Sequence, residues 1–463
     1  MPAQSDDRIA FEFLPDVPVV VQRHAGQITS DAGLLPVRQF DQGWRFTERL
    51  AACLTDALPG RVQSLLSMVR QRVFGIIAGY EDCNDHDLLR DEPVFKMIAD
   101  RSPEGDPLAS QPTLSRFENG VTDADFRRLV DFTVATGVER LADVNQGGVP
   151  ASVTLDLDAT DDTTHGHQQL SLFHGYYDQY QYYPLIISEM RTRHVLLAQL
   201  RHGTAHASLG ADDDVMKVVN ALRAKRPDVA VHVRGDAGFG VPVMYDVCEA
   251  NGLTYTLGFS SNPRLKRMTE GLMARAVEQF KRTGEKARLF ECFQYQCKDW
   301  PCARTVVAKA ECHAGGTNLR FVVTNLPDVT TAADGERVYD DYIQRGESEH
   351  RMDELKNGLG AGRLSCHRFK ANFFRLILHT AAYNLTNALR DHPDLPQIIQ
   401  RGQPQTLRTH LIKVAATIVT TTRRVVVQLA GQWPWWLTYQ AVAARAMTFA
   451  PAPATATACP APS

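Results

Sequence analysis

The stretch VPASVTLDLDAT (residues 149–160) has the pattern of a β-strand that ends in carboxylates. Side chains of a strand alternate between its two faces, so Leu155 and Leu157 point to the same side. Asp156 and Asp158 point to the other side. The leucines are expected to pack beneath a sheet while the aspartates face a cleft. The stretch therefore predicts a sheet strand that carries Asp158 at its end.

The elements predicted after this strand follow the order of a known fold class. Two more strands are followed by an amphipathic helix, a strand, a second helix and a further strand. In chain order they cover residues 176–190, 194–203, 212–227, 229–240, 241–252 and 253–260. Three adjacent hairpin strands, then parallel strands reached through helices, are the order of the RNase H-like fold. We therefore predict an α/β protein with an RNase H-like domain.

A second aspartate, Asp236, closes the fourth predicted strand in the sequence RGDAGFG. The glycines around it allow backbone or substrate to approach closely. In an RNase H-like sheet the first and fourth strands are neighbours, so the carboxylates of Asp158 and Asp236 are expected to meet. The alternative is that each is a turn residue, the ordinary role of aspartate at a strand end, which we assign to Asp161 and Asp162.

The stretch YDDYIQRGESEHRMDELK (residues 339–356) predicts a helix with a polar face. Each helical residue advances by about 100°, so Tyr342, Glu349 and Lys356 lie nearly in one row. Arg345 lies one turn before the glutamate on the same face. Such a face is usually solvated and held by ion pairs within the helix. It is also a plausible face to present to a metal ion and a phosphate backbone.

Three acids in this topological order suggest one reaction. Asp158, Asp236 and Glu349 offer oxygen ligands, which suit Mg²⁺ or Mn²⁺. Two such ions, about 3.5–4 Å apart, can activate water or a 3′-hydroxyl for in-line attack on phosphorus. The sequence thus predicts two metal ions held by these carboxylates.

Neighbouring residues fit a nucleic-acid substrate. Arg345 and Lys356 are expected to hold phosphates near the scissile bond, the arginine through bidentate contacts. Tyr342 can donate a hydrogen bond to a phosphate or stack on a sugar or base. Trp300, in KDWPC, can stack on an unpaired DNA base. The competing interpretation for Trp300 is packing within its own domain.

Composition bounds the class of protein. The chain has 463 residues, 44% hydrophobic and 22% charged, as in an ordinary multidomain globular protein. It has no apolar run long enough to span a membrane and no secretory signal at its start. Nine scattered cysteines suggest reduced thiols, so we expect a cytoplasmic location and no membrane partner.

Charge is unevenly distributed along the chain. The formal net charge is −3, but residues 356–424 contain eleven Lys or Arg residues against two acids. A basic face on a near-neutral protein can still bind phosphates, although a solvated surface explains the same composition. Four cysteines, Cys292, Cys297, Cys302 and Cys312, lack the close pairs of structural zinc sites, so zinc is disfavoured.

The remaining segments complete a domain scheme. Several short helices in tandem, with Arg70, Arg72, Arg90, Lys96, Arg101 and Arg116, predict a DNA-binding region, or equally a helical scaffold. Three strand patterns before residue 335 predict a β-rich insertion. The scheme is an extended arm (1–30), a helical DNA-binding region (31–148), a catalytic core in two parts (149–260 and 336–392), the insertion (261–335), a C-terminal hairpin and helix (393–449) and a disordered tail (450–463).

The chain resembles the DDE transposases of bacterial insertion sequences, of the group called transposase DDE domain group 1. LDLDATDDTTHGHQ, VRGDAGFG and YIQRGESEHRMDELKNG carry the resemblance, the last with the Tyr-x2-Arg-x3-Glu-x6-Lys signature. SDAGLLPVRQFD, TERLAACLTD, GYEDCNDHDLLRDEP and LASQPTLSRFENG extend it through the N-terminal part. The resemblance thus spans nearly the whole chain, to about Thr448.

This resemblance implies roles for individual residues. Asp158, Asp236 and Glu349 would be the metal-binding catalytic acids, and Arg345 and Lys356 would contact DNA beside the cleavage point. The N-terminal helices would recognise terminal inverted repeats, and the enzyme would act on double-stranded DNA as a homodimer. It assigns no role to His165.

Three functional hypotheses follow from the sequence. The first is a Mg²⁺-dependent transposase that cleaves element ends and joins them to target DNA. The second is a catalytically inactive or domesticated DNA-binding derivative, which the presence of all three acids and both basic residues disfavours. The third is a stand-alone nuclease of the same fold, which the N-terminal helices and the basic C-terminal half disfavour.

Overall fold

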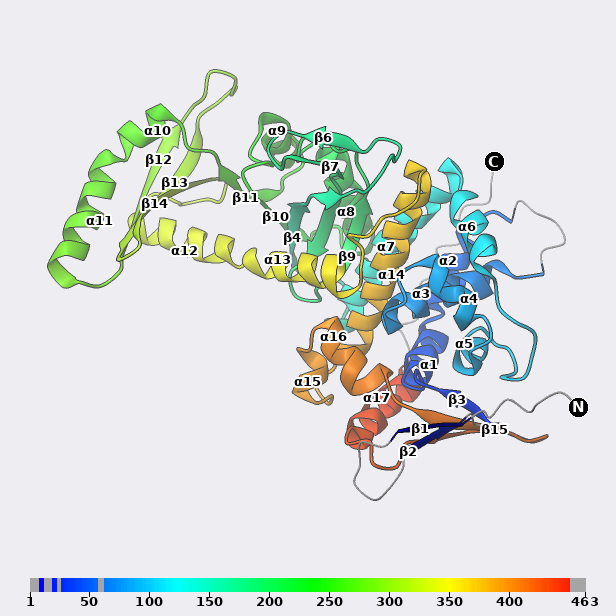
Figure 1. Ribbon diagram of the computed structural model, residues 1–463. Coiled ribbons are helices and arrows are strands. Elements are labelled where there is room, and N and C mark those ends of the chain that lie inside the picture. The colour runs from blue at the N-terminus through cyan, green and yellow to red at the C-terminus, as the bar shows by residue number, and fades with distance from the viewer. Residues whose placement is uncertain (1–7, 12–18, 23–25, 57–61, 450–463) are drawn as a thin grey trace, which may run out of the picture.

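A computed structural model describes residues 8–11, 19–22, 26–56 and 62–449. Its centre is an eight-stranded mixed sheet, with helices packed around it (Figure 1). The predicted tail, residues 450–463, lies outside the described residues, as do parts of the predicted arm.

Five strands of this sheet form an RNase H-like core in the order β9–β8–β4–β10–β11. They are β4 (Ser152–Ala159), β8 (Leu185–Glu189), β9 (Val195–Gln199), β10 (Ala230–Gly235) and β11 (Thr254–Phe259). β4, β8 and β9 pair antiparallel, whereas β10 is parallel to both β4 and β11. The helices α8 (Ala211–Lys225) and α9 (Pro242–Ala250) make the predicted crossovers. The predicted fold class is confirmed.

The segment between Tyr176 and Met190, predicted as one strand, is divided in two. Its first half, β7 (Gln179–Tyr182), joins β5 (Asp162–Thr163) and β6 (Leu172–His174) in a separate three-stranded sheet. Its second half is β8 of the central sheet. Pro184 lies at the division, where it cannot donate the backbone hydrogen bond of a continuous strand.

The β-rich insertion continues the central sheet. Its strands β12 (Ala287–Tyr295), β13 (Arg304–His313) and β14 (Gly316–Thr324) match the three predicted strands, and β14 pairs antiparallel with β11. Two helices precede them that were not predicted, α10 (Pro263–Met268) and α11 (Glu270–Thr283). Leu272 and Ala276 bury one face of α11, which lies at the end of the molecule far from the N-terminal helices (Figure 1).

The N-terminal region is helical, as predicted. After β1 (Arg8–Phe11), β2 (Val19–Gln22) and β3 (Gln27–Thr29) it contains α1 (Leu34–Trp44), α2 (Phe46–Ala52), α3 (Leu65–Ala78), η1 (Cys83–Asp85), α4 (His86–Leu89), α5 (Pro93–Ile98), α6 (Gln111–Asn119) and α7 (Asp123–Val144). The Ser64 side chain caps the start of α3. Gly79, with φ of 93°, ends it where the left-handed conformation favours glycine.

Several cations predicted to face DNA from this region are buried instead. Arg70, Arg72 and Lys96 are between 0% and 7% exposed. Arg70 lies against Asp41 and forms an ion pair with Asp100. For these three residues the structure supports the alternative of a helical scaffold, because a buried guanidinium or ammonium cannot reach a phosphate.

The C-terminal part returns to the N-terminal part. It consists of α14 (Phe369–Arg390), α15 (Gln397–Gln400), α16 (Pro404–Leu407), the π-turn η3 (Arg408–Ile412), β15 (Ala416–Thr420), β16 (Val425–Leu429) and α17 (Trp436–Thr448). β15 and β16 form the predicted hairpin, and β3 adds to it as a third strand. The two ends of the chain therefore share one small sheet.

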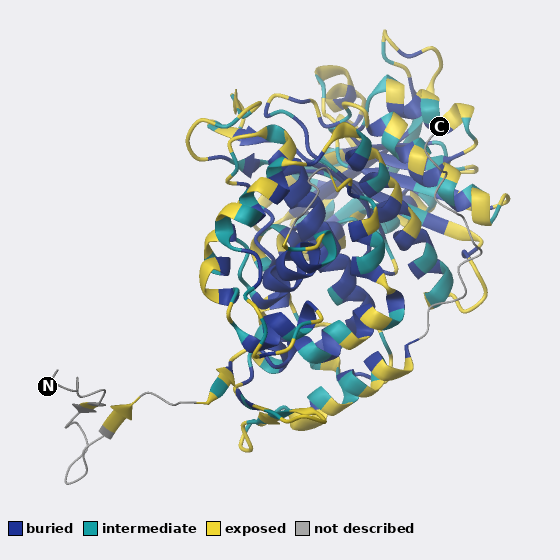
Figure 2. Ribbon diagram, turned by 90° about the vertical axis from the view of Figure 1, so that its right-hand side faces the viewer, coloured by how far each residue is buried: buried dark blue, intermediate teal, exposed yellow. Residues whose placement is uncertain are grey.

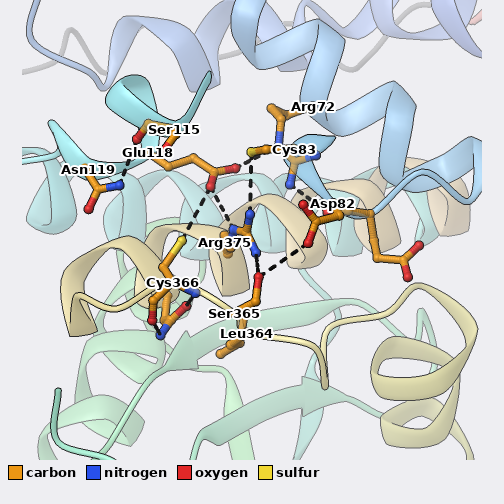
Figure 3. A network of polar contacts seen from close by, with 12 residues as sticks. Arg72, Asp82, Cys83, Ser115, Glu118, Asn119, Leu364, Ser365, Cys366 and Arg375 are labelled. Atoms are coloured by element: carbon orange, nitrogen blue, oxygen red, sulfur yellow. Dashed lines mark hydrogen bonds and ion pairs between the residues drawn. The ribbon is translucent and has the colours of Figure 1, made fainter. Parts of the chain in front are cut away.

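α14 is buried along nearly its whole length. Buried helices fill the middle of the molecule in Figure 2. On one side Asn384 bonds both backbone groups of Val195 in β9. On the other side Arg375 reaches the N-terminal helices, where Glu118 lies between Arg375 and Arg72 (Figure 3). Both Glu118–arginine distances, 2.8 and 2.7 Å, are those of charge-assisted hydrogen bonds. The ion pairs of Arg72, Glu118 and Arg375 thus connect the N-terminal helices to α14.

The basic stretch after Lys356 does not form one face. Three of its arginines are buried or half-buried and make contacts inside the protein: Arg375, Arg390 and Arg408. Arg390 forms an ion pair with Glu354, and Arg408 donates to the carbonyls of α3. The composition of this stretch therefore reflects internal pairing as well as surface charge.

Candidate active site

Asp158 and Asp236 lie side by side at the ends of two parallel strands. In the register of β4 and β10, Arg234 faces Asp156 and Gly235 faces Leu157. The next residues along the two strands are Asp158 and Asp236. The predicted meeting of the first and fourth strands is confirmed, and it places both carboxylates at one edge of the sheet.

Backbone geometry fixes the position of Asp236. The N–H of Gly238 donates to the Asp236 carboxylate at 2.9 Å. Gly258 of the neighbouring strand approaches so closely that a side chain there would meet backbone atoms of residues 236 and 237. The glycines around the carboxylate thus serve close packing of the strand ends, as the sequence suggested.

Asp156 does not face an open cleft, contrary to the sequence-based expectation. It is 0% exposed, and Arg234 grips it with two hydrogen bonds of 2.8 and 3.1 Å. A second guanidinium, of Arg351, lies 3.8 Å from it. The alternation along β4 was correctly predicted. Because Asp156 pairs with Arg234, however, it is a buried structural residue and not part of an open cleft.

The predicted helix of residues 339–357 is interrupted. α12 (Ala332–Ile343) is followed by a tight turn, α13 (Gly346–Asp353) and a π-turn, η2 (Glu354–Gly358). Hydrogen bonds between residues three apart link Asp341 to Gln344 and Arg345 to Ser348. These bonds wind the chain more tightly than an α-helix, so the angular argument from a regular helix holds only approximately.

Arg345 connects two of the three acids. Its guanidinium lies 3.0 Å from the Glu349 carboxylate and 3.9 Å from that of Asp158. Asp158 and Arg345 are 13% and 14% exposed at their side chains, whereas Glu349 is 66% exposed. The structure thus brings the acids around one guanidinium, with Glu349 at the solvent side.

Tyr342 lies against the same cluster. If Gly258 carried a β-carbon, that atom would lie 2.8 Å from the Tyr342 hydroxyl and 2.8 Å from the backbone of Asp236. The hydroxyl is therefore close to the Asp236 backbone. Burial raises the pKa of the Tyr342 phenol, with the nearby carboxylates of Asp236 and Glu349 contributing in the same direction. The phenol is therefore protonated at neutral pH and can donate a hydrogen bond.

The electrostatics of Asp158 are unusual for an aspartate. Burial raises its pKa to about 6, and repulsion from Asp236, Glu349 and Asp156 adds to this, while Arg345 opposes it. Negative charge is therefore in excess around Asp158. A cluster of this kind favours an additional cation.

The acids fit a hard divalent cation by their chemistry. Within the described residues, no three His, Cys, Asp or Glu side chains are close enough to hold a metal ion, which applies equally to the cysteines of the insertion. Arg345 occupies the space between Asp158 and Glu349. The donors are nevertheless all carboxylate oxygens, as Mg²⁺ and Mn²⁺ prefer, and burial, with repulsion from the other acids, raises the pKa of Asp158 despite Arg345.

Lys356 is tied to the chain just beyond β4. Its ammonium donates to the Thr160 hydroxyl at 3.0 Å and to the carbonyl of Asp161, whose carboxylate lies 3.5 Å away. Lys356 therefore contacts Thr160, which is two residues after Asp158 in the chain, so its ammonium lies close to the site. The sequence did not predict that Asp161, assigned only to a turn, would be its partner.

Trp300 is in a different environment from the one proposed for DNA contact. It is 5% exposed and packs among Tyr245, Phe259 and Tyr295, with the guanidinium of Arg304 over its ring. The ring is not accessible to a base in this structure. The alternative interpretation, packing at the junction of the insertion and the core, accounts for it.

The family model for transposase DDE domain group 1 matches residues 11–449. The chain belongs to this family. No curated protein matches the chain. Among solved structures, a piggyBac transposase in a synaptic complex with hairpin DNA is similar at 12% identity, over 82% of this chain and 79% of that chain, with a TM-score of 0.42.

The family match covers the whole RNase H-like core. The assignment applies to the N-terminal helices and the insertion as well, because the match runs through both. Among the described helices of this transposase-family chain, none is long and apolar enough to cross a membrane.

Proposed function

We propose that this protein is the DNA transposase of an insertion sequence. It cuts DNA at the terminal inverted repeats of its element and transfers the 3′ ends into target DNA. The observation that supports the proposal is that Asp158 and Asp236 lie at adjacent strand ends while Arg345 links Asp158 to Glu349.

The three acids hold Mg²⁺ or Mn²⁺ in this proposal. Two such ions, when bound, would lower the pKa of the attacking water or 3′-hydroxyl and would stabilise the departing oxygen. Asp158 and Asp236 are positioned by the sheet, whereas the exposed Glu349 is free to adjust its rotamer. Because Asp158 has a pKa of about 6, it must lose its proton before it can serve as a ligand.

The neighbouring donors bind the DNA backbone. Arg345 exchanges its contact with Glu349 for a phosphate once a metal cation compensates the acids. Lys356 and the protonated Tyr342 donate hydrogen bonds to phosphates on either side of the scissile bond. The helical region of residues 31–148 recognises the inverted repeats, and two copies act together on the two element ends.

Cleavage of DNA that carries the inverted repeats flanking the gene tests the proposal. Purified protein with Mg²⁺ is expected to cut at the repeat ends. Asp158→Ala, Asp236→Ala and Glu349→Ala are each expected to lower the rate by roughly 10³-fold or more, since loss of one electrostatic stabiliser alone costs about 10²–10³-fold.

Glu347→Gln and Asp353→Asn are the matched controls, because both acids lie on α13 and are exposed, and the ion pairs of Arg345 go to Asp158 and Glu349 instead. They are expected to keep full activity. Binding without cleavage in every divalent metal would indicate an inactive derivative. Cleavage without preference for the ends would indicate a nuclease.

A further inference from the structure

A small sheet of aromatic residues lies directly beyond the end of β4. We call β6 (Leu172–His174), β7 (Gln179–Tyr182) and the turn between them the aromatic hairpin. Three of its rings are exposed to solvent: Phe173 at 46%, Tyr176 at 85% and Tyr180 at 59%. Large apolar rings are normally covered, so three on one hairpin require an explanation.

The exposed rings are held in two pairs on the hairpin. Phe173 and Tyr180 face each other in the register of β6 and β7, with ring centroids 5.6 Å apart. At the turn, Tyr176 packs edge-on against Tyr177 at 5.0 Å. The contacts hold the rings in place while leaving much of their surface open. A patch with these properties is suited to stacking on flat, partly polar partners.

The aromatic hairpin is attached to the candidate active site. Asp161 accepts a hydrogen bond from Gln179 of β7 at 3.0 Å, and its backbone carbonyl accepts one from Lys356. Burial raises the pKa of Tyr177, and the nearby charges of Asp161 and Asp236 add to the effect. The hairpin is therefore held beside the segment that directly follows β4, through the contact of Gln179 with Asp161.

The hairpin itself carries few charged side chains. Between Thr163 and Tyr182 the only acidic residue is Asp178. The chain before α14 runs alongside, with the N–H of Gln169 donating to the carbonyl of His367 at 2.9 Å. Arg368, next to it, is exposed and forms no ion pair within the described part of the chain. Exposed rings with one exposed arginine nearby match nucleic acid, which presents bases and phosphates together.

We propose that the aromatic hairpin stacks on unpaired bases of DNA beside the scissile phosphate. The inference rests on the proposed function, because it needs a DNA strand in the neighbouring site. Stacking on neighbouring base pairs hides the faces of bases within a duplex, so the hairpin selects DNA that is frayed or opened near the cut. The aromatic hairpin thus provides a stacking surface for DNA bases, which Trp300 cannot provide because it is buried.

Fluorescence of 2-aminopurine tests the proposal without requiring cleavage. The probe is a short duplex with a single-stranded thymidine extension that contains 2-aminopurine, in Ca²⁺ buffer, compared with the blunt duplex alone. Full-length protein is expected to quench the 2-aminopurine and to bind the extended probe more tightly than the blunt one.

The variant Phe173→Ala/Tyr176→Ala/Tyr180→Ala is expected to lose the quenching and to bind the extended probe about 5- to 150-fold more weakly, with blunt-duplex affinity unchanged. Tyr176→Phe, which keeps the ring, should retain quenching. Trp436→Ala on α17 is the matched control, since Trp436 is an exposed aromatic, 49% accessible, on an element remote in the fold. Thermal melting verifies that each variant folds.

Equal affinity of the wild type for both probes, or quenching that survives in the triple variant, would overturn the proposal. So would an altered oligomeric state of the triple variant with unchanged DNA binding, because the hairpin would then contact a second copy of the chain. These outcomes leave metal-dependent cleavage at repeat ends intact, whereas failure of the proposed function removes cleavage from the wild type itself.

Discussion

Two clusters of ionised side chains in this molecule have opposite balances of charge. Around Glu118 one carboxylate lies between two guanidiniums, those of Arg72 and Arg375 (Figure 3). At the end of β4 three carboxylates share the single guanidinium of Arg345. The first cluster is fully buried, whereas in the second Asp158 and Arg345 are mostly buried and Glu349 is exposed.

The pKa values reflect this balance. Burial raises the pKa of Glu118, but the two arginines outweigh it and lower the value to about 2. Burial and repulsion instead raise the pKa of Asp158 to about 6. The first cluster stabilises the fold, whereas the second retains charge that only a further cation can compensate. We therefore predict that the first cluster is structural and that the second is functional.

The largest expected effect is the loss of the balanced cluster. Glu118→Gln leaves two buried guanidiniums without their carboxylate and is expected to cost about 3–5 kcal/mol of unfolding free energy. Because the Glu118 pKa is depressed, its contribution is present above about pH 4.5 and is lost as the pH falls toward 2. Urea unfolding at several pH values measures it; an unchanged midpoint near pH 7 would show that the network is dispensable.

The opposite sign is expected at the unbalanced cluster. Asp158→Asn removes repelling charge and should stabilise the metal-free protein at pH 7.5 by up to about 3 kcal/mol, the equivalent of a shift from 3.8 to about 6. Since the folded pKa is raised, wild-type stability falls as the pH rises between about 4 and 6. The gain should therefore vanish below pH 4 in melting curves, and a destabilised variant at pH 7.5 would contradict the assignment.

The smallest effect is expected for acids on α13 outside the cluster. Glu347→Gln and Asp353→Asn should change unfolding free energy by no more than about 0.5 kcal/mol, because both side chains are exposed. Glu354 cannot serve as such a control, since it is buried against Arg390 at 2.7 Å. A large loss of stability in either exposed variant would show that α13 is positioned differently.

Much of the core and the candidate site could be predicted because local patterns determine them. Alternation along β4 separates Leu157 from Asp158, and strand order in the sheet brings Asp236 beside Asp158. Helical spacing places Arg345 and Glu349 on one face even though the helix is interrupted between α12 and α13. In each case the information lies within a few residues or in the order of elements.

Other features depend on partners far apart in the chain and could not be predicted. Trp300 is buried because Tyr245 and Phe259 come from strands and helices of the core. Arg375 is internal because Glu118, on a helix more than 250 positions earlier, reaches it. The local sequence around an arginine or a tryptophan can be the same whether the side chain is buried or exposed. Only the tertiary structure distinguishes these two environments.

Binding of Mn²⁺, followed by electron paramagnetic resonance in the presence of uncleaved duplex DNA, tests most directly whether the unbalanced cluster is a cation site. The wild type and Glu347→Gln are expected to bind the ion, with affinity falling as the pH drops below about 6 because Asp158 becomes protonated. Asp158→Asn and Asp236→Asn should abolish this binding. Equal Mn²⁺ binding by wild type and Asp158→Asn would contradict the assignment of these acids as metal ligands.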